Sequence, residues 1–180
     1  MPETMAESQD LRYPIGRFVP PQVSSPAIRA EQIENLRHAP ELLRASVSGL
    51  SDAQLDTAYR EDGWIVRQVV HHLADSHANA FIRFKLALTE DWPTVKPYDE
   101  AAWATLVDSR QPIVESLAMF GALHGRWVAL LKSMTDEDFQ KGFNHPKMGR
   151  QSLAASLALY SWHARHHTAH ITGLRARQGW

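Results

Sequence analysis

Four long segments of the chain repeat apolar residues every three or four positions, the spacing that places them on one face of an α-helix. These segments begin at about residues 25, 65, 112 and 152 and end at about residues 48, 88, 131 and 177. No alternation typical of a β-strand runs for more than a few residues. Four such apolar stripes can be buried against one another, so we predict an all-α fold, a four-helix bundle.

Capping residues mark where these helices begin. Ser25 precedes Pro26, and proline is favoured in the first turn of a helix. Residues 51–54 read Ser-Asp-Ala-Gln, a capping box that predicts a short helix between the first two long ones. Residues 135–138 form a similar pattern with Asp where Glu or Gln is usual, and Ser152 is the expected cap of the last long helix.

The segments between the long helices differ in length. Residues 92–97 contain two prolines and lead to a short helix predicted near 99–107, which makes this connection a long crossover. Residues 142–150 are predicted to form a loop. Residues 1–24 carry four prolines and little periodicity, so we expect an extended N-terminal arm, disordered at its start, over a bundle formed by residues 25–180.

Composition narrows the classes of protein to which such a bundle can belong. The 180 residues suit one domain, and they include no cysteine, which excludes disulfides, thiolate metal sites and cysteine nucleophiles. A formal net charge of −1 indicates no partner among nucleic acids or anionic membranes. No uncharged stretch is long enough to span a bilayer, and the polar start of the chain lacks the features of a signal peptide, so we expect a cytoplasmic protein.

Most of the ten histidines lie in two stretches of the predicted helices, residues 69–77 and 162–170. At 100° per residue, His163 and His167 fall at about −80° and −40° from Leu153, beside or on the inward apolar stripe of the last helix. Residues four positions apart are neighbours on a helix surface. The two imidazoles can therefore converge on one metal ion.

A third ligand must come from another helix, since two imidazoles hold a metal ion weakly. His72 lies about 40–60° from the centre of the inward stripe of the second long helix. His71 points about 100° away, toward solvent or a subunit edge, whereas His77 lies on the core side as a hydrogen-bonded core histidine would. A site made of His72, His163 and His167 leaves at least one coordination position open, as catalytic metal sites do.

Each of these side chains also has a simpler explanation. An inward histidine is more often hydrogen-bonded than bound to metal, and pairs four residues apart occur by chance in a histidine-rich chain. We expect a structural or surface role for His71, His77, His166 and His170. His166 and His170 turn outward, because they fall at about −140° and −100° from Leu153 on the last helix. Asp75 is a candidate for orienting a ligand imidazole through its second nitrogen, or it is an ordinary solvated residue.

Several segments of the chain resemble the DinB-like superfamily, and within it the YfiT-like branch. The longest is residues 63–77, which read GWIVRQVVHHLADSH. The others are residues 13–16 (YPIG), 82–86 (IRFKL), 123–127 (LHGRW) and 162–172 (WHARHHTAHIT). The resemblance extends from Leu11 to Trp180, nearly the whole chain.

The resemblance implies a four-helix bundle in which three histidines bind a divalent metal, zinc or nickel. Carried over position by position, the ligands are His72, His163 and His167, the same three that the helical registry favours. The branch is described as metal-dependent hydrolases, and the wider superfamily includes thiol S-transferases that use bacillithiol or mycothiol. Homodimers are common in it, so the resemblance also implies a homodimer.

Two reactions are open to such a site. A metal ion with open positions can lower the pKa of bound water, for hydrolysis, or can bind the sulfur of a small thiol and favour its thiolate. We expect the second, a thiol S-transferase in detoxification, as the resemblance to the wider superfamily implies. It fits a chain without cysteine, because the reacting sulfur would arrive with a low-molecular-weight thiol. The alternatives are a metal-dependent hydrolase and a metal-binding bundle without catalysis. The Glu-x-x-His pairs of di-iron bundles and the nucleotide-binding glycine motifs are absent from the sequence.

Overall fold

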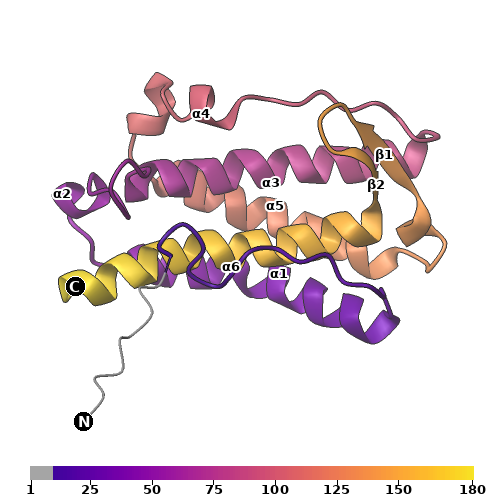
Figure 1. Ribbon diagram of the computed structural model, residues 1–180, viewed down its shortest axis with the longest axis horizontal. Helices are drawn as coiled ribbons and strands as arrows, with labels where there is room; N and C mark the ends of the chain where they lie inside the picture. The colour runs from indigo at the N-terminus through magenta and orange to yellow at the C-terminus, as the bar shows by residue number, and fades with distance from the viewer. Residues whose placement is uncertain (1–9) are drawn as a thin grey trace, which may run out of the picture.

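Four long helices form the body of the molecule (Figure 1) in the computed structural model, which describes residues 10–180. The long helices are α1 (Pro26–Val47), α3 (Val66–Thr89), α5 (Val114–Ser133) and α6 (Leu153–Gln178). Helix α1 packs on α5 and α6, and α3 packs on the same two helices, which closes the bundle. The predicted four-helix bundle is confirmed. The predicted disorder at the start of the arm concerns residues that lie outside the described range.

Short elements occupy the connections between the long helices. They are α2 (Asp52–Leu55), α4 (Glu100–Trp103), the 3-10 helices η1 (Val107–Arg110) and η2 (Asp138–Gln140), and the strands β1 (Gly142–His145) and β2 (Gly149–Ser152). The connection from α3 to α5 runs along the outer side of α3 and carries α4 (Figure 1). This is the long crossover that the proline-marked segment predicts.

The predicted caps are present at the helix starts. The side chain of Ser25 accepts a hydrogen bond from the backbone N–H of Ile28, and that of Ser152 accepts one from Ala155. Ser51 and Gln54 form the reciprocal capping box at α2. These contacts satisfy backbone donors that the first turn of a helix leaves without partners.

The loop predicted at residues 142–150 is wrong, because this segment begins with β1 of an antiparallel hairpin and ends in β2. Gly142 pairs with Ser152 and His145 pairs with Gly149 across the turn. A Cβ atom at Gly142 would lie 2.1 Å from the carbonyl oxygen of Gln151, so this close pairing requires glycine. Four-residue strands are too short to show a period of two, and their partner is fixed by the turn rather than by local sequence.

The hairpin is joined to the crossover at one end of the bundle. Val95 donates its N–H to the carbonyl of Asn144 at 3.0 Å, and Asn144 donates its N–H to Pro93 at 2.9 Å. These bonds hold the hairpin and the crossover beside the end of α3. The hairpin and the crossover also form walls of the pocket described below.

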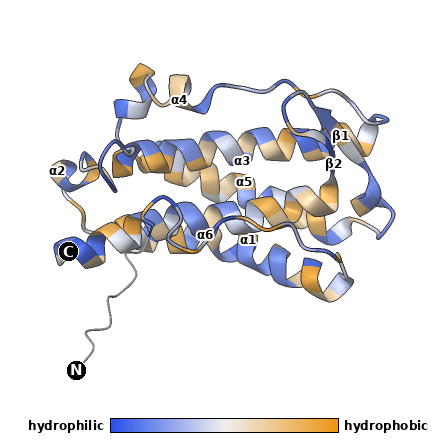
Figure 2. Ribbon diagram, viewed as in Figure 1, coloured by the Kyte–Doolittle hydropathy of each residue, from blue (hydrophilic) through white to orange (hydrophobic). Residues whose placement is uncertain are grey.

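Two apolar clusters fill the interior, and a layer of histidines lies between them. The cluster nearer the hairpin includes Leu36, Phe84 and Trp127. The second cluster includes Leu43, Leu73 and Phe120. In Figure 2 orange and blue segments alternate along each long helix, as expected where one face of a helix is buried. No helix in the described part of the chain is long and apolar enough to cross a bilayer.

Candidate metal centre

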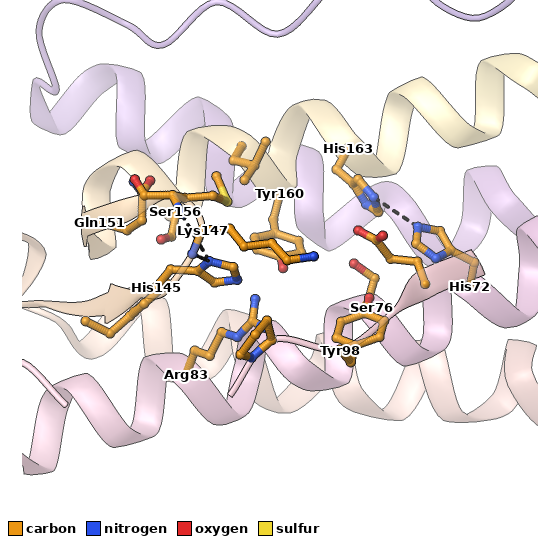
Figure 3. A pocket seen from close by; sticks show the side chains of 15 residues that line it. His72, Ser76, Arg83, Tyr98, His145, Lys147, Gln151, Ser156, Tyr160 and His163 are labelled. Atoms are coloured by element: carbon orange, nitrogen blue, oxygen red, sulfur yellow. Dashed lines mark hydrogen bonds between the residues drawn. The ribbon is translucent and has the colours of Figure 1, made fainter. Parts of the chain in front are cut away.

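The structure brings the three predicted ligands together in the middle of the bundle. His72 lies on α3, and His163 and His167 lie one turn apart on α6. One ring nitrogen from each lies within 4.8 Å of the others, and the Nε2 atoms of His72 and His163 are 3.3 Å apart (Figure 3). Three imidazole nitrogens converging from two helices are a donor set that suits zinc or nickel.

Aromatic packing holds the ligand rings in place. Trp64, just before α3, lies with its ring centroid 4.7 Å from that of His72 and 6.4 Å from that of His167. The rings of His163 and His167 are edge to face at 4.5 Å. Trp64 thus packs against predicted ligands from both helices.

Burial keeps the ligand imidazoles neutral. It lowers the pKa of His72 from 6.5 to about 4. Burial, followed by the neighbouring histidines, lowers the pKa of His163 and of His167 well below the usual value. Neutral imidazoles have a free ring nitrogen to offer to a metal ion, so the three side chains fit one without first losing a charge-carrying proton.

Further histidines contact the ligands on the sides away from the convergence point. His77 Nε2 lies 3.2 Å from Nδ1 of His163, and His77 Nδ1 lies 3.0 Å from Nε2 of His124. Nδ1 of His170 lies 3.3 Å from Nδ1 of His167. His77 is fully buried and hydrogen-bonded, as predicted for a core histidine.

His124 on α5 was not singled out from the sequence, although its spacing carried a signal. It stands four residues after Phe120 and three before Trp127, both of which are buried, so it shares their inward face. It is 1% exposed and donates from Nδ1 to the carbonyl oxygen of Leu36 at 2.6 Å. A buried polar residue at such a position needs a partner, and the partner is a backbone carbonyl on α1.

Of the two surroundings predicted for His71, solvent or a subunit edge, solvent is wrong. His71 is 8% exposed, donates from Nε2 to the carbonyl of Gln111 at 3.1 Å, and accepts at Nδ1 from the hydroxyl of Ser116 at 2.7 Å. The crossover and the start of α5 cover this face of α3. Arg67, one turn earlier on the same face, is also buried there.

His166 and His170 do not lie at the surface, since the two are 6% and 3% exposed. The arm lies over this side of α6. Tyr13 of the arm packs against His166 with ring centroids 6.0 Å apart, and the carbonyl of Arg12 accepts from Nε2 of His170 at 3.2 Å. Both side chains point away from the bundle core, as the helical registry predicts, but the N-terminal arm covers them there.

Asp75 does not orient a ligand in this structure. It forms no hydrogen bond with any histidine of the described chain, and it is partly exposed on α3. Burial, followed by the charge of Asp108, raises its carboxyl pKa. The side chains within hydrogen-bond distance of His163 and His167 are histidines, and these chains of contacts end on backbone carbonyls.

A pocket of about 310 Å³ opens beside the centre. Figure 3 shows His72 and His163 at one end of it and His145 and Gln151 of the hairpin at the other. The polar side chains between them include Ser76, Arg83, Tyr98, Lys147, Ser156 and Tyr160, and Pro97, Phe143, Met148 and Leu159 add apolar surface. Burial raises the pKa of Tyr98 to about 12 and also raises that of Tyr160, so both hydroxyls keep their protons at neutral pH.

These features define a four-helix bundle with a histidine cluster that could hold a metal ion at the end of a pocket with polar and apolar walls. The model of the DinB superfamily matches residues 35–171, and the chain belongs to that superfamily. A protein of Bacillus mycoides called "Putative metal-dependent hydrolase" is 52% identical over 96% of this chain and 99% of its own. A protein of Bacillus cereus with the same description is 53% identical over 95% of this chain and 99% of its own.

Solved structures agree with the fold. YfiT from Bacillus subtilis, described as "a probable metal-dependent hydrolase with an unusual four-helix bundle topology", superposes with a TM-score of 0.92 and 50% identity over 94% of this chain and 98% of its own. TT2238, a four-helix bundle protein, superposes with a TM-score of 0.54 and 18% identity over 84% of this chain and 99% of its own. The second match bears on the fold alone.

Proposed function

We propose that this protein is a metal-dependent enzyme in which His72, His163 and His167 hold one divalent ion, zinc or nickel, and that it transfers an electrophilic group to the sulfur of a small thiol. The observation that carries the proposal is the convergence of three neutral imidazoles at the inner end of a pocket. An ion held there supplies Lewis acidity, which favours the deprotonated form of a bound thiol or water.

The residues of the pocket determine what can reach the centre. Arg83 and Lys147 form no ion pair with any residue of the described chain, and Glu100 is the one acid among the lining residues. Two cations without an ion-pair partner in the described chain favour a substrate with an anionic group. The protonated hydroxyls of Tyr98 and Tyr160 can donate hydrogen bonds to it. The reacting sulfur has to come with the cosubstrate, since the chain has no cysteine.

Hydrolysis is the second candidate. Relatives at 52% and 53% identity carry the description "Putative metal-dependent hydrolase", and the same three-histidine centre suits water as well as a thiol. In that case the Arg83 and Lys147 side would bind the acidic part of an ester or amide substrate.

One set of assays separates these functions. Elemental analysis should find one zinc or nickel ion per chain, and the holoprotein should couple a low-molecular-weight thiol to monochlorobimane faster than the uncatalysed reaction. Faster cleavage of esters or amides without thiol transfer would instead favour the hydrolase. A metal-binding bundle without catalysis would retain the ion and show neither activity.

Matched variants test the site itself. His163→Ala should lose both the metal and the activity while its helical circular dichroism is retained. His38→Ala removes a half-exposed histidine of α1 and should leave both unchanged. Retention of metal and activity by His163→Ala would overturn the proposal.

A further inference from the structure

Two runs of histidine contacts lead away from the ligands on α6, and each ends on a backbone carbonyl. One run passes from His163 through His77 and His124 to the carbonyl of Leu36 on α1. The other passes from His167 through His170 to the carbonyl of Arg12 in the arm. A carbonyl oxygen can only accept a hydrogen bond, so each end fixes the direction of the run that leads to it.

The first run can be followed from its carbonyl end. His124 must donate from Nδ1 to Leu36, and a neutral imidazole carries one ring hydrogen, so its Nε2 is an acceptor. His77 must then donate from Nδ1 to His124, which leaves Nε2 of His77 as an acceptor. His163 must in turn donate from Nδ1 to His77. The network therefore assigns the Nδ1–H tautomer to His163 and leaves its Nε2 lone pair facing His72, 3.3 Å away.

The second run gives the same result for the other ligand. His170 donates from Nε2 to the carbonyl of Arg12, so its Nδ1 is an acceptor. His167 must donate from Nδ1 to His170, at 3.3 Å, and its Nε2 is left with a free lone pair. Two separate runs thus leave the same nitrogen free on both ligands of α6.

We propose that two positioning relays hold the ligands of α6 as Nδ1–H tautomers and present both of their Nε2 atoms to a metal ion. The first relay, His77 with His124, holds His163. The second relay, His170 with the Arg12 carbonyl, holds His167. The role given to these relays depends on the three-histidine metal site proposed above. The tautomers themselves are a property of the metal-free chain. They can therefore be tested whether or not the proposed enzymatic function holds.

A second metal site is the rival explanation for the contacts around His170. Ring nitrogens of His166, His167 and His170 lie within 4.8 Å of one another, and Nδ1 of His166 is buried without a hydrogen-bond partner in the described chain. The relay is favoured because both nitrogens of His170 already have partners, the Arg12 carbonyl and His167. An ion bound there would have to break the bond between His167 and His170.

Nitrogen-15 NMR of the metal-free protein reads the tautomers directly. With ¹⁵N-labelled histidine at neutral pH, two-bond ¹H–¹⁵N correlations should show the Nδ1–H form for His77, His124, His163 and His167, and the Nε2–H form for His170. Single-histidine variants assign the signals. The Nε2–H form at His163 would overturn the first relay, and the same form at His167 would overturn the second.

Paired variants test whether the relays matter to the metal. His77→Leu and His170→Leu remove the acceptor and should weaken Zn²⁺ binding by about 10–100-fold, measured against a competing chelator. His77→Gln and His170→Gln keep an oxygen acceptor and an N–H donor, so their affinity should return to within a few-fold of the wild type. Equal losses in the Leu and Gln variants would contradict the relay.

His166→Leu is the matched control, because His166 is equally buried on the same face but belongs to neither relay. Its Zn²⁺ affinity and its Co²⁺ absorption spectrum should equal those of the wild type. A second Zn²⁺ ion per chain that is lost in this variant would establish the rival site and overturn the second relay. Failure of the wild type to bind any Zn²⁺, Ni²⁺ or Co²⁺ would remove the proposed function, while the NMR result would still decide the tautomers.

Discussion

Histidine in this protein is a core residue as well as a proposed metal ligand. His77 and His124 are 0% and 1% exposed, and they contact Phe120 and Trp127 from the two apolar clusters. A buried charged imidazole without a carboxylate partner is costly, so burial keeps these rings neutral. Neutral rings can both donate and accept a hydrogen bond. They can therefore be linked in series, which lysine and arginine cannot do.

This arrangement makes stability depend on pH at the residue scale. Burial lowers the pKa of His72, His124, His166 and His170 to about 4 in the folded state, from 6.5 in the unfolded chain. Well above pH 6.5 these four imidazoles are neutral in both the folded and the unfolded chain. Between pH 6.5 and about 4 only the unfolded chain takes up protons, so the free energy of unfolding falls as the pH falls. Each such histidine contributes up to about 1.4 kcal/mol per pH unit.

We therefore expect urea unfolding of the metal-free protein to show a plateau above pH 7 and a steep loss of stability from pH 6.5 to 5. Unfolding curves at half-unit pH steps measure this slope. The variant His38→Gln should show the same slope, because His38 is half exposed. A free energy of unfolding that stays constant over this range would show that these histidines titrate normally in the folded state.

Among the elements, the short helix α2 and the crossover are joined to the start of α3 by one buried arginine. Arg67 near the start of α3 is 5% exposed and donates to Asp56 at 2.8 Å, to Asp52 of α2 at 2.9 Å and to the carbonyl of Gln111 at 3.2 Å. One guanidinium thus joins α2, α3 and the end of the crossover. The planar fork of arginine suits several acceptors at once, whereas the lysine ammonium does not.

Arg67→Met should lower the free energy of unfolding by about 1.5–3 kcal/mol, the range for hydrogen bonds to charged groups. Arg67→Lys should recover only part of this loss, because a single ammonium cannot reach the three acceptors together. Thermal and urea unfolding of both variants measure the two values. Full recovery by lysine would mean that the charge, and not the fork geometry, joins these elements.

The N-terminal arm is the second element with a measurable effect. It covers His166 and His170 through Tyr13 and the Arg12 carbonyl, and Phe18 packs on Trp162 of α6 at 5.8 Å.

A chain shortened to begin at residue 19 should expose both His166 and His170 to diethyl pyrocarbonate. Mass spectrometry locates the modified residues. His77, buried between other helices, should stay unmodified in the same sample. Equal protection of His166 and His170 in the full and shortened chains would show that the arm does not shield them.

At the scale of the whole molecule, the limits of sequence analysis follow the distance between contacting residues. The faces of His72, His163 and His167 could be predicted because helical registry is a local property. His71, His166 and His170 were misplaced because the crossover and the arm, far away in sequence, cover the faces on which they lie. The relays through His124 and the Arg12 carbonyl could not be predicted either, because their partners are far apart in the sequence. The hairpin at residues 142–152 was missed for a different reason, because its four-residue strands are too short to show a period of two.

The candidate metal centre joins α3 to α6, so metal binding should be visible in the stability of the whole bundle. An ion that binds only the folded chain, at 100 times its Kd, stabilises it by about 2.7 kcal/mol. At about 2–4 °C per kcal/mol for a chain of this size, the Tm should rise by about 5–10 °C on adding Zn²⁺ or Ni²⁺. A chelator should reverse the rise, and calorimetry or circular dichroism measures it.

Variants decide where such a stabilisation arises. His72→Ala and His163→Ala each remove one ligand, from α3 and from α6, and each should abolish the rise in Tm. His145→Ala removes a histidine at the far end of the same pocket and should keep it. If the rise in Tm survived both ligand variants, the ion would be bound elsewhere on the chain. Loss of the rise in only one of them would mean that one helix alone holds the ion, and that the bundle does not depend on the metal to join its two halves.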